Sequence, residues 1–292
     1  MTAATVKTLP CADGWTLSVE EHIPQGGIRA VAVVGHAMMV DRRTMDARGD
    51  GLVSELARAG VAVLSADLRG HGQSGPLAAE GGRWDYDDLV EQDARALVRE
   101  ARARFPGARV VAVGHSLFGH VAIAHAARFL GEAPDAIVAI AANLWLPRWE
   151  PSPSLRLVKR AILEGSAAVA RAIGYLPARR VRFGSADESR DYCLSFVRDW
   201  HADRWSSNDF FDYTDALASV RTPVLAIVGS GDRLMCREPS ARRMYREIPS
   251  ATVELAGRAS GLPIDPDHMQ VVTDERCRPL WQRIARFVVE GK

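Results

Sequence analysis

The chain has 292 residues, of which 47% are hydrophobic and 25% charged, so it can bury a sizeable core and has the composition of an ordinary globular protein. Lysine and arginine number 37 against 36 aspartates and glutamates, and the formal net charge of +1 gives no electrostatic reason to expect a nucleic acid or an anionic membrane as a partner. No apolar run approaches the roughly 20 residues that span a bilayer, and residues 1–9 lack the basic start and apolar stretch of a secretory signal.

Strand and helix patterns alternate along most of the chain. The first two strand patterns flank an Asp13-Gly14 turn and indicate a β-hairpin, whereas the later apolar runs are typical of strands covered on both faces. The predicted strands are residues 6–9, 16–21, 30–35, 61–66, 110–113, 137–142, 224–229 and 252–255, and the predicted helices are residues 52–59, 87–104, 121–130, 239–248 and 279–290. This alternation predicts an α/β protein with a mostly parallel sheet and right-handed crossovers.

The alternation stops between residues 143 and 219. This segment holds four of the seven tryptophans, Trp145 among them, and a group of prolines separates it from the strand before. We interpret it as a helical cap over the carboxyl edge of the sheet. The predicted organisation is therefore a core of residues 1–142 and 220–292 with a cap insert of residues 143–219.

Ser116 stands where a buried strand turns sharply into a helix. The segment Gly114-His115-Ser116-Leu117-Phe118-Gly119 follows a β-branched apolar run, and residues 121–130 repeat apolar positions at helical spacing. A serine at such a turn projects its hydroxyl above the sheet edge, beside the free N–H groups of the helix N-terminus. The pattern predicts a nucleophile for acyl transfer, although a serine after a strand can also be only a helix N-cap.

Phe118 departs from the usual Gly-x-Ser-x-Gly pattern, in which a glycine stands two residues after the serine. If Phe118 faces the sheet, it needs small neighbours, which Ala139, Ala141 and Ala142 could provide. If it faces the cleft, it narrows the acyl pocket, and if the turn has shifted, the serine is disabled. We hypothesise that Phe118 is accommodated and that activity is retained.

With these motifs in this order, the chain resembles the α/β-hydrolase superfamily over nearly its whole length. Besides the serine turn, Asp67-x-Arg69-Gly70-x-Gly72-x-Ser74 resembles the loop after the fourth strand of that fold, and residues 224–232 resemble the strand and turn that present its acid. The resemblance implies a central sheet of about eight strands flanked by helices, with the cap inserted before the acid-bearing strand.

The superfamily orders its catalytic triad along the chain as serine, acid, histidine. Matched to this sequence, the triad is Ser116, Asp232 and His268. Asp232 follows the carboxyl end of a buried strand, and His268 follows the last predicted strand. In these roles the imidazole takes the serine proton, and the carboxylate fixes the imidazole tautomer.

The same resemblance implies an oxyanion hole made by two backbone N–H groups, those of Leu117 and Met38. In the loop that supplies Met38, Ala37 stands where a glycine is usual, and the His36-Ala37 pair also resembles the loop of homoserine acyltransferases. We expect His36, Phe118 and Trp145 to line the substrate pocket.

These features predict a cytoplasmic serine hydrolase that cleaves a small ester or thioester with an apolar, uncharged acyl group, without cofactor or metal. The four cysteines show no metal-ligand spacing and are expected to be free thiols. Two alternatives stay open, namely an acyltransferase using the same acyl-enzyme and a catalytically silent protein that binds a hydrophobic ligand. Dehalogenases and epoxide hydrolases with this fold use an aspartate where Ser116 stands, so the serine argues against both of these chemistries. The sequence makes no prediction of the oligomeric state.

Overall fold

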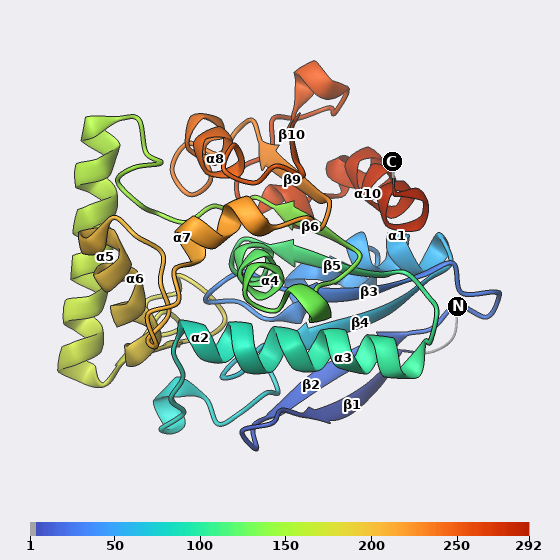
Figure 1. The fold of residues 1–292 in the computed structure, drawn as a ribbon, viewed down its shortest axis with the longest axis horizontal. Coiled ribbons are helices and arrows are strands. Elements are labelled where there is room, and N and C mark those ends of the chain that lie inside the picture. The colour runs from blue at the N-terminus through green and yellow to red at the C-terminus, as the bar shows by residue number, and fades with distance from the viewer. Residues whose placement is uncertain (1–3, 292) are drawn as a thin grey trace.

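The computed structural model describes residues 4–291, so the first three residues of the segment searched for a secretory signal lie outside it. Within the described chain, eight strands form one sheet in the order β1-β2-β4-β3-β5-β6-β9-β10 (Figure 1). The β1-β2 and β2-β4 pairs are antiparallel and all other neighbours are parallel. The strands are β1 Thr5–Pro10, β2 Thr16–His22, β3 Ala30–Gly35, β4 Val61–Asp67, β5 Val110–His115, β6 Ala136–Ile140, β9 Val224–Gly229 and β10 Ala251–Ala256. The predicted α/β-hydrolase architecture is confirmed.

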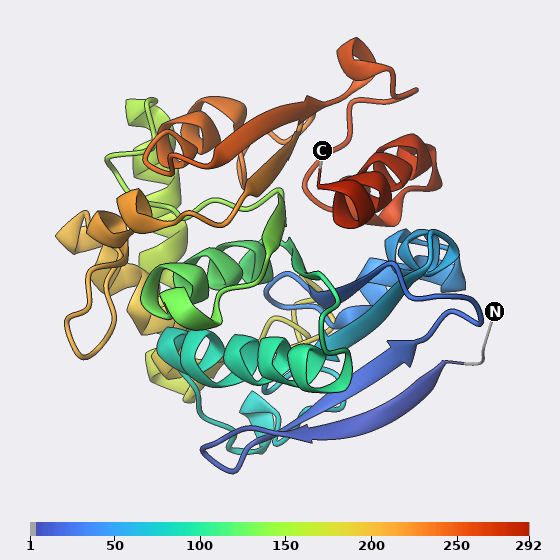
Figure 2. The same ribbon diagram turned by 45° about the vertical axis from the view of Figure 1, so that its right-hand side comes forward.

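Helices cover both faces of this sheet. Helices α1 (Leu52–Arg58) and α10 (Arg278–Glu290) lie on one face, and α3 (Arg95–Arg104) and α4 (Leu117–Arg128) lie on the other (Figures 1 and 2). Every residue of the four central strands β3, β5, β6 and β9 is buried, as their continuous apolar runs predict. The carboxyl ends of these strands therefore lie at the edge of a buried core.

The long helix predicted before the serine turn is built from three successive pieces. It begins as α2 (Tyr86–Asp88), continues through a π-helical stretch (Leu89–Ala94) and ends as α3. The side chain of Asp85 caps its start by accepting the N–H groups of Asp87 and Asp88. Two further core helices are α8 (Glu238–Tyr245) and the short α9 (Gln270–Thr273).

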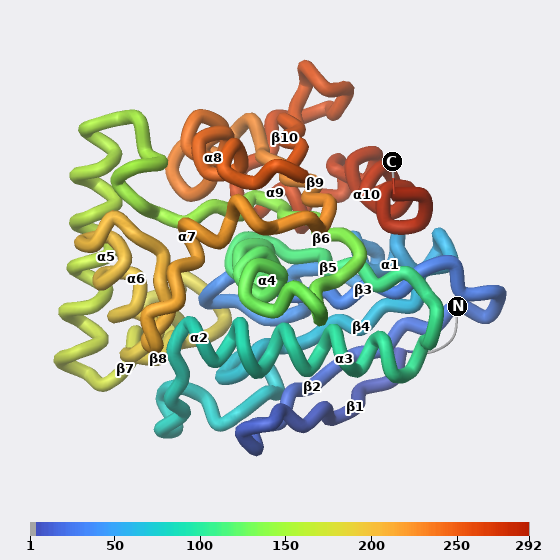
Figure 3. The backbone as a smooth tube through the Cα atoms, viewed as in Figure 1, coloured from blue at the N-terminus to red at the C-terminus, as the bar shows by residue number. Residues whose placement is uncertain are grey.

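The segment of residues 143–219, interpreted above as a cap insert, lies on one side of the sheet (Figure 3). Its helix α5 (Pro153–Ile173) packs against α6 (Arg190–Ala202), and α7 (Tyr213–Ala216) follows before the chain returns to the sheet. A two-stranded antiparallel ribbon of β7 (Tyr175–Leu176) and β8 (Glu188–Ser189) joins α5 to α6. This ribbon, which the sequence pattern does not predict, carries contacts to the site described below.

Candidate active site

Ser116 occupies the turn between β5 and α4 in a backbone conformation that is rare for a residue with a side chain. Its φ is +48° and its ψ is −102°, and its N–H donates to the carbonyl of Ile140 at 2.8 Å. The turn is so tight that a Cβ at Gly114 would lie 2.3 Å from the backbone nitrogen of Gly119. Such a turn holds the serine out from the end of the strand, as the nucleophile hypothesis requires.

Phe118 faces the sheet and is fully buried. Its ring lies over Gly35 at the end of β3, where an added Cβ would come within 2.2 Å of the Phe118 Cγ. Of the alanines proposed as neighbours of Phe118, Ala142 packs against Gly119, where an added Cβ would lie 2.5 Å from the Ala142 Cβ. The expectation that Phe118 lines the pocket is therefore wrong, because a glycine on the neighbouring strand makes room for its ring inside the core.

Asp232 and His268 meet although 36 positions separate them in the sequence. Nδ1 of His268 lies 2.8 Å from Oδ2 of Asp232, which also accepts the N–H of Cys236, while Oδ1 accepts those of Leu234 and Met235. A carboxylate only accepts, so Nδ1 carries a proton, and in the neutral tautomer of this ring Nε2 keeps its lone pair. The Asp232 and His268 side chains are 2% and 14% exposed, so the acid is shielded while the base can be reached.

The surroundings of Asp232 favour its charged form. Burial raises the pKa of the carboxyl, but the hydrogen bond and charge of His268 and the backbone N–H donors lower it by more, and the net pKa lies below its usual value. The loop that carries the base packs closely on the loop that carries the acid, since a Cβ at Gly231 would lie 2.4 Å from the carbonyl oxygen of Asp265. The glycine of Ser230-Gly231-Asp232 is therefore needed for this close approach.

His115, directly before Ser116, ties the loop of His268 to the serine turn. Its Nε2 donates to the backbone carbonyl of His268 at 2.8 Å, and the two rings lie 5.0 Å apart. Burial and the neighbouring His268 lower the pKa of His115 to about 3, so the ring is neutral, with its proton on Nε2. This contact places the backbone of His268 beside the residue next to Ser116, and the sequence pattern does not predict it.

The loop after β3 supplies the second predicted oxyanion donor. The carbonyl of His36 accepts the N–H of Phe118 at 3.3 Å, which sets this loop against the first turn of α4. In the described part of the chain, neither the Met38 N–H nor the Leu117 N–H donates to a protein acceptor. Two free donors thus stand near the nucleophile turn, as an oxyanion hole requires.

His36 orients the peptide unit that carries the Met38 N–H. Its Nε2 accepts the N–H of Leu68 at 3.0 Å, so its proton is on Nδ1, which donates to the carbonyl of Ala37 at 2.7 Å. Because the peptide is trans, holding this carbonyl fixes the Met38 N–H in the opposite direction. Burial and the nearby His71 lower the pKa of His36 to about 3. His36 is fully buried, so the expectation that it lines the pocket is corrected to a role in shaping the loop.

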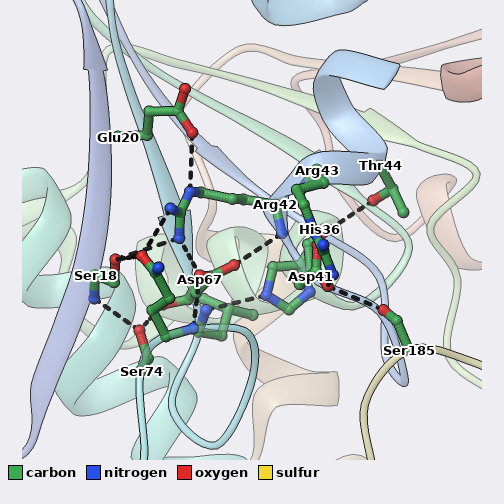
Figure 4. A network of polar contacts seen from close by, with 12 residues as sticks. Ser18, Glu20, His36, Asp41, Arg42, Arg43, Thr44, Asp67, Ser74 and Ser185 are labelled. Carbon is green, nitrogen blue, oxygen red and sulfur yellow. Dashed lines mark hydrogen bonds and ion pairs between the residues drawn. The ribbon is translucent and has the colours of Figure 1, made fainter. Parts of the chain in front are cut away.

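A buried polar network anchors the rest of this loop to β4 (Figure 4). Oδ1 of Asp67 accepts the backbone N–H of Arg42 at 2.9 Å, and the Arg42 guanidinium pairs with Oδ2 of Asp67 and with Glu20. Gly72, with a φ of +51°, leaves space for the Asp67 carboxylate, since a Cβ there would lie 2.2 Å from Oδ2. The Asp67-to-Ser74 motif is thus a structural support for the loop after β3.

Trp145, the third residue expected at the pocket, lies half-buried beside the acid loop. Its Nε1 donates to the carbonyl of Met235 at 2.8 Å, and Nζ of Lys159 stands 5.1 Å from its ring centroid. The ring therefore lies between Lys159 of helix α5 and the turn that follows Asp232. Its contact with substrate stays a prediction.

Within residues 4–291, no three His, Cys, Asp or Glu side chains are grouped so that they could hold a metal ion, and all four cysteines are buried and unpaired. No helix in this range is both long and apolar enough to cross a bilayer.

The sheet order and the strand-turn-helix carrying Ser116 define an α/β-hydrolase. A family model for serine aminopeptidases of the S33 group matches residues 44–191, about half of the chain, and the chain belongs to this family of hydrolases.

Solved structures share the fold along nearly the whole chain. An esterase from Exiguobacterium antarcticum is 15% identical with a TM-score of 0.64, over 97% of this chain and 99% of its own. An esterase from Pyrococcus furiosus is 17% identical with a TM-score of 0.61, over 98% and 90%. A thermophilic esterase from Thermogutta terrifontis is 18% identical with a TM-score of 0.57, over 97% of both chains. At these identities the likeness is one of fold.

Proposed function

We propose that this protein is a serine hydrolase that cleaves a carboxylic ester or thioester of an uncharged, apolar acyl group through an acyl-enzyme on Ser116. The observation that carries the proposal is the 2.8 Å contact of His268 Nδ1 with Asp232, on a loop that His115 ties to the nucleophile turn. An imidazole with a fixed tautomer and a free Nε2 is the base that a serine nucleophile needs.

In the proposed reaction, Nε2 of His268 takes the proton of Ser116 as Oγ bonds to the substrate carbonyl carbon. The carbonyl electron pair moves onto oxygen, and the resulting oxyanion accepts the N–H groups of Met38 and Leu117. The leaving alkoxide or thiolate departs with the proton from His268. Water then repeats the sequence on the acyl-enzyme, which releases the carboxylic acid and restores Ser116.

The apolar acyl group is supported by the uncharged side chains of Met38, the proposed donor, and Trp145, which contacts the carbonyl of Met235 beside Asp232. The carboxylate of Asp232 is itself shielded by burial and by its partners. A small, uncharged ester is therefore a better match than a charged substrate. The unpaired cysteines support a reducing, cytoplasmic setting as part of the proposal.

A fluorophosphonate probe tests the nucleophile, because only an activated serine reacts rapidly with it. We expect rapid labelling of the native protein and none of Ser116→Ala, with Asp232→Asn slowed about 10³-fold or more. A panel of p-nitrophenyl esters of increasing chain length then tests the acyl group. Native protein that neither labels nor hydrolyses any ester would contradict the proposal.

Two other chemistries on the same acyl-enzyme can be separated by their products. The His36-Ala37 resemblance favours an acyltransferase, which would form new esters when alcohols or thiols are added. The description of the matching family, serine aminopeptidase, suggests peptide substrates. Hydrolysis of aminoacyl p-nitroanilides would reveal such an aminopeptidase activity. The silent binding protein, which the departures at Phe118 and Ala37 favour, loses the support of Phe118, because that ring fits over Gly35 without entering the site.

A further inference from the structure

The cap insert contacts the loop after β3, which carries the predicted donor Met38 and is called the oxyanion loop below. The contact is made at Met39, the residue after that donor. Oε1 of Glu188, from β8, accepts the backbone N–H of Met39 at 2.6 Å. Glu188 is fully buried, and within the described chain its second oxygen has no partner. Its hydrogen bonds are therefore confined to the loop and to one further group, His71.

The insert also holds the other side of Met39. The N–H of Ala186 donates to the Met39 carbonyl at 2.9 Å, and a Cβ at Gly184 would lie 2.1 Å from the same oxygen. Met39 itself has a φ of +60°, which costs free energy for a residue with a side chain. Contacts on both sides keep the loop in this conformation. Ser185 adds a hydrogen bond to Asp41, 3.1 Å long and visible in Figure 4.

His71 fixes the position of the Glu188 carboxylate. Its Nε2 lies 3.1 Å from Oε1 of Glu188 and its Nδ1 lies 2.8 Å from the carbonyl of Arg69. Both ring nitrogens thus face acceptors, which is the arrangement of an imidazolium. Burial disfavours this charge, but Glu188, the Arg69 carbonyl and Asp67 together outweigh it, and the pKa of His71 lies above its usual value. The hydrogen bond from His71 therefore holds the Glu188 carboxylate in the orientation in which it accepts the Met39 N–H.

We propose that Glu188 is a positioning residue for the oxyanion hole, so that the cap insert, docked through Glu188, Ala186 and Gly184, sets the direction of the Met38 N–H. His36 fixes the peptide before Met38 and Glu188 fixes the peptide after it, so both dihedrals of Met38 are held. This inference rests on the proposed function, in which Met38 donates to the oxyanion. It adds a cap residue that no local sequence pattern connects with the site.

The kinetic test compares Glu188→Ala with Asp187→Ala, a matched control in which the neighbouring buried acid, which accepts the N–H of Arg179, is removed. For Glu188→Ala we expect kcat to fall about 10- to 100-fold with KM within about threefold, since an oxyanion donor acts mainly in the transition state. A trifluoromethyl ketone inhibitor should weaken by the same factor as kcat/KM. The apparent pKa of the kcat/KM profile should not move, because Asp232 and His268 are untouched.

Glu188→Gln keeps an oxygen acceptor for Met39 and should restore kcat to within about fivefold of the native value. Equal losses in the Glu188 and Asp187 variants, or a change in KM alone, would overturn the proposal.

Amide exchange in the nitrogen-15-labelled full chain separates this inference from the proposed function, because it needs no activity. We expect the Met39 amide to be protected in the native protein and in Asp187→Ala, and exposed in Glu188→Ala. Should Glu188→Ala fail to fold, the native chain and Glu188→Gln still decide the matter. A Met39 amide that exchanges like a free loop amide in the native protein refutes the inference, whereas a protected amide in a protein without esterase activity refutes only the proposed function.

Discussion

Phe118 and Gly35 form a complementary pair, in which the ring of one residue occupies the space that a side chain would take at the other. A Cβ at position 35 would lie 2.2 Å from the Phe118 Cγ, so Gly35→Ala forces the ring or the strand to move. We expect Gly35→Ala to lower the free energy of unfolding by about 1–3 kcal/mol or more, through overpacking. Urea unfolding of the purified variant measures this loss.

Phe118→Ala should also destabilise the protein, by about 3–5 kcal/mol, because it leaves a cavity. In the double variant the new methyl group enters that cavity, so the two losses should sum to more than the measured total by about 1–3 kcal/mol. Strict additivity would show that the two residues do not share the space.

His115 should affect the reaction through the position of His268. His115→Phe removes the N–H that donates to the His268 carbonyl and fills a similar volume. We expect kcat/KM for p-nitrophenyl acetate to fall about 10- to 100-fold, because a small displacement of a catalytic group is costly. His115→Gln, which keeps a donor, should recover most of the loss. A His115→Phe enzyme with native kinetics would show that the hydrogen bond from His115 to the His268 carbonyl is not needed for activity.

His36 should control the Met38 N–H rather than substrate binding. His36→Phe lacks the Nδ1 proton that holds the Ala37 carbonyl, and we expect kcat to fall about 10²-fold with little change in KM. His125→Gln is the matched control, since His125 is also buried but sits near the far end of α4, where it contacts the carbonyl of Glu132. A rise in KM alone would instead support the pocket-lining role first expected of His36.

His120 should make the fold sensitive to acid. Burial lowers the pKa of His120 to about 3, against about 6.5 in an unfolded chain. Between these values the unfolded chain binds a proton that the folded chain does not, so stability falls as the pH is lowered through this range. This single group should cost about 2 kcal/mol between pH 7 and pH 5.

His120→Gln removes this titration while keeping an acceptor for the Tyr86 hydroxyl, which lies 2.8 Å from His120. Its free energy of unfolding should therefore fall less than that of the native protein between pH 7 and pH 5, by about 2 kcal/mol. Parallel pH curves for the two proteins would contradict this assignment.

Local patterns were enough to predict the strands, the serine turn and the helices beside it. Runs such as residues 30–35 and 224–229 are apolar because both of their faces are covered, and that constraint is visible one strand at a time. Asp232 and His268 could be nominated because the order of such groups along the chain is shared by the superfamily. Their contact in the structure agrees with that nomination, while their roles in catalysis stay a prediction.

Local sequence patterns do not predict contacts between segments that are distant along the chain. Glu188 lies 149 positions from Met39, and a short ribbon strand in a region of broken rhythm carries no signal of that pairing. The sequence predicts His36 and Phe118 at the pocket from their positions beside the predicted oxyanion donors, and it does not show which way either side chain points. The glycine that ends the strand before His36 was the available clue, since it offers space where Phe118 needs it.

The grip of residues 184–188 on Met39 bears on efforts to change specificity by exchanging insertions between related enzymes. A transplanted insert that lacks a glycine, an amide and an acid at the positions of Gly184, Ala186 and Glu188 would leave the recipient scaffold with its serine, histidine and aspartate intact but the proposed oxyanion donor misaligned. Chimeras of this protein would then be well folded yet slow, and restoring those three positions would be the first repair to make.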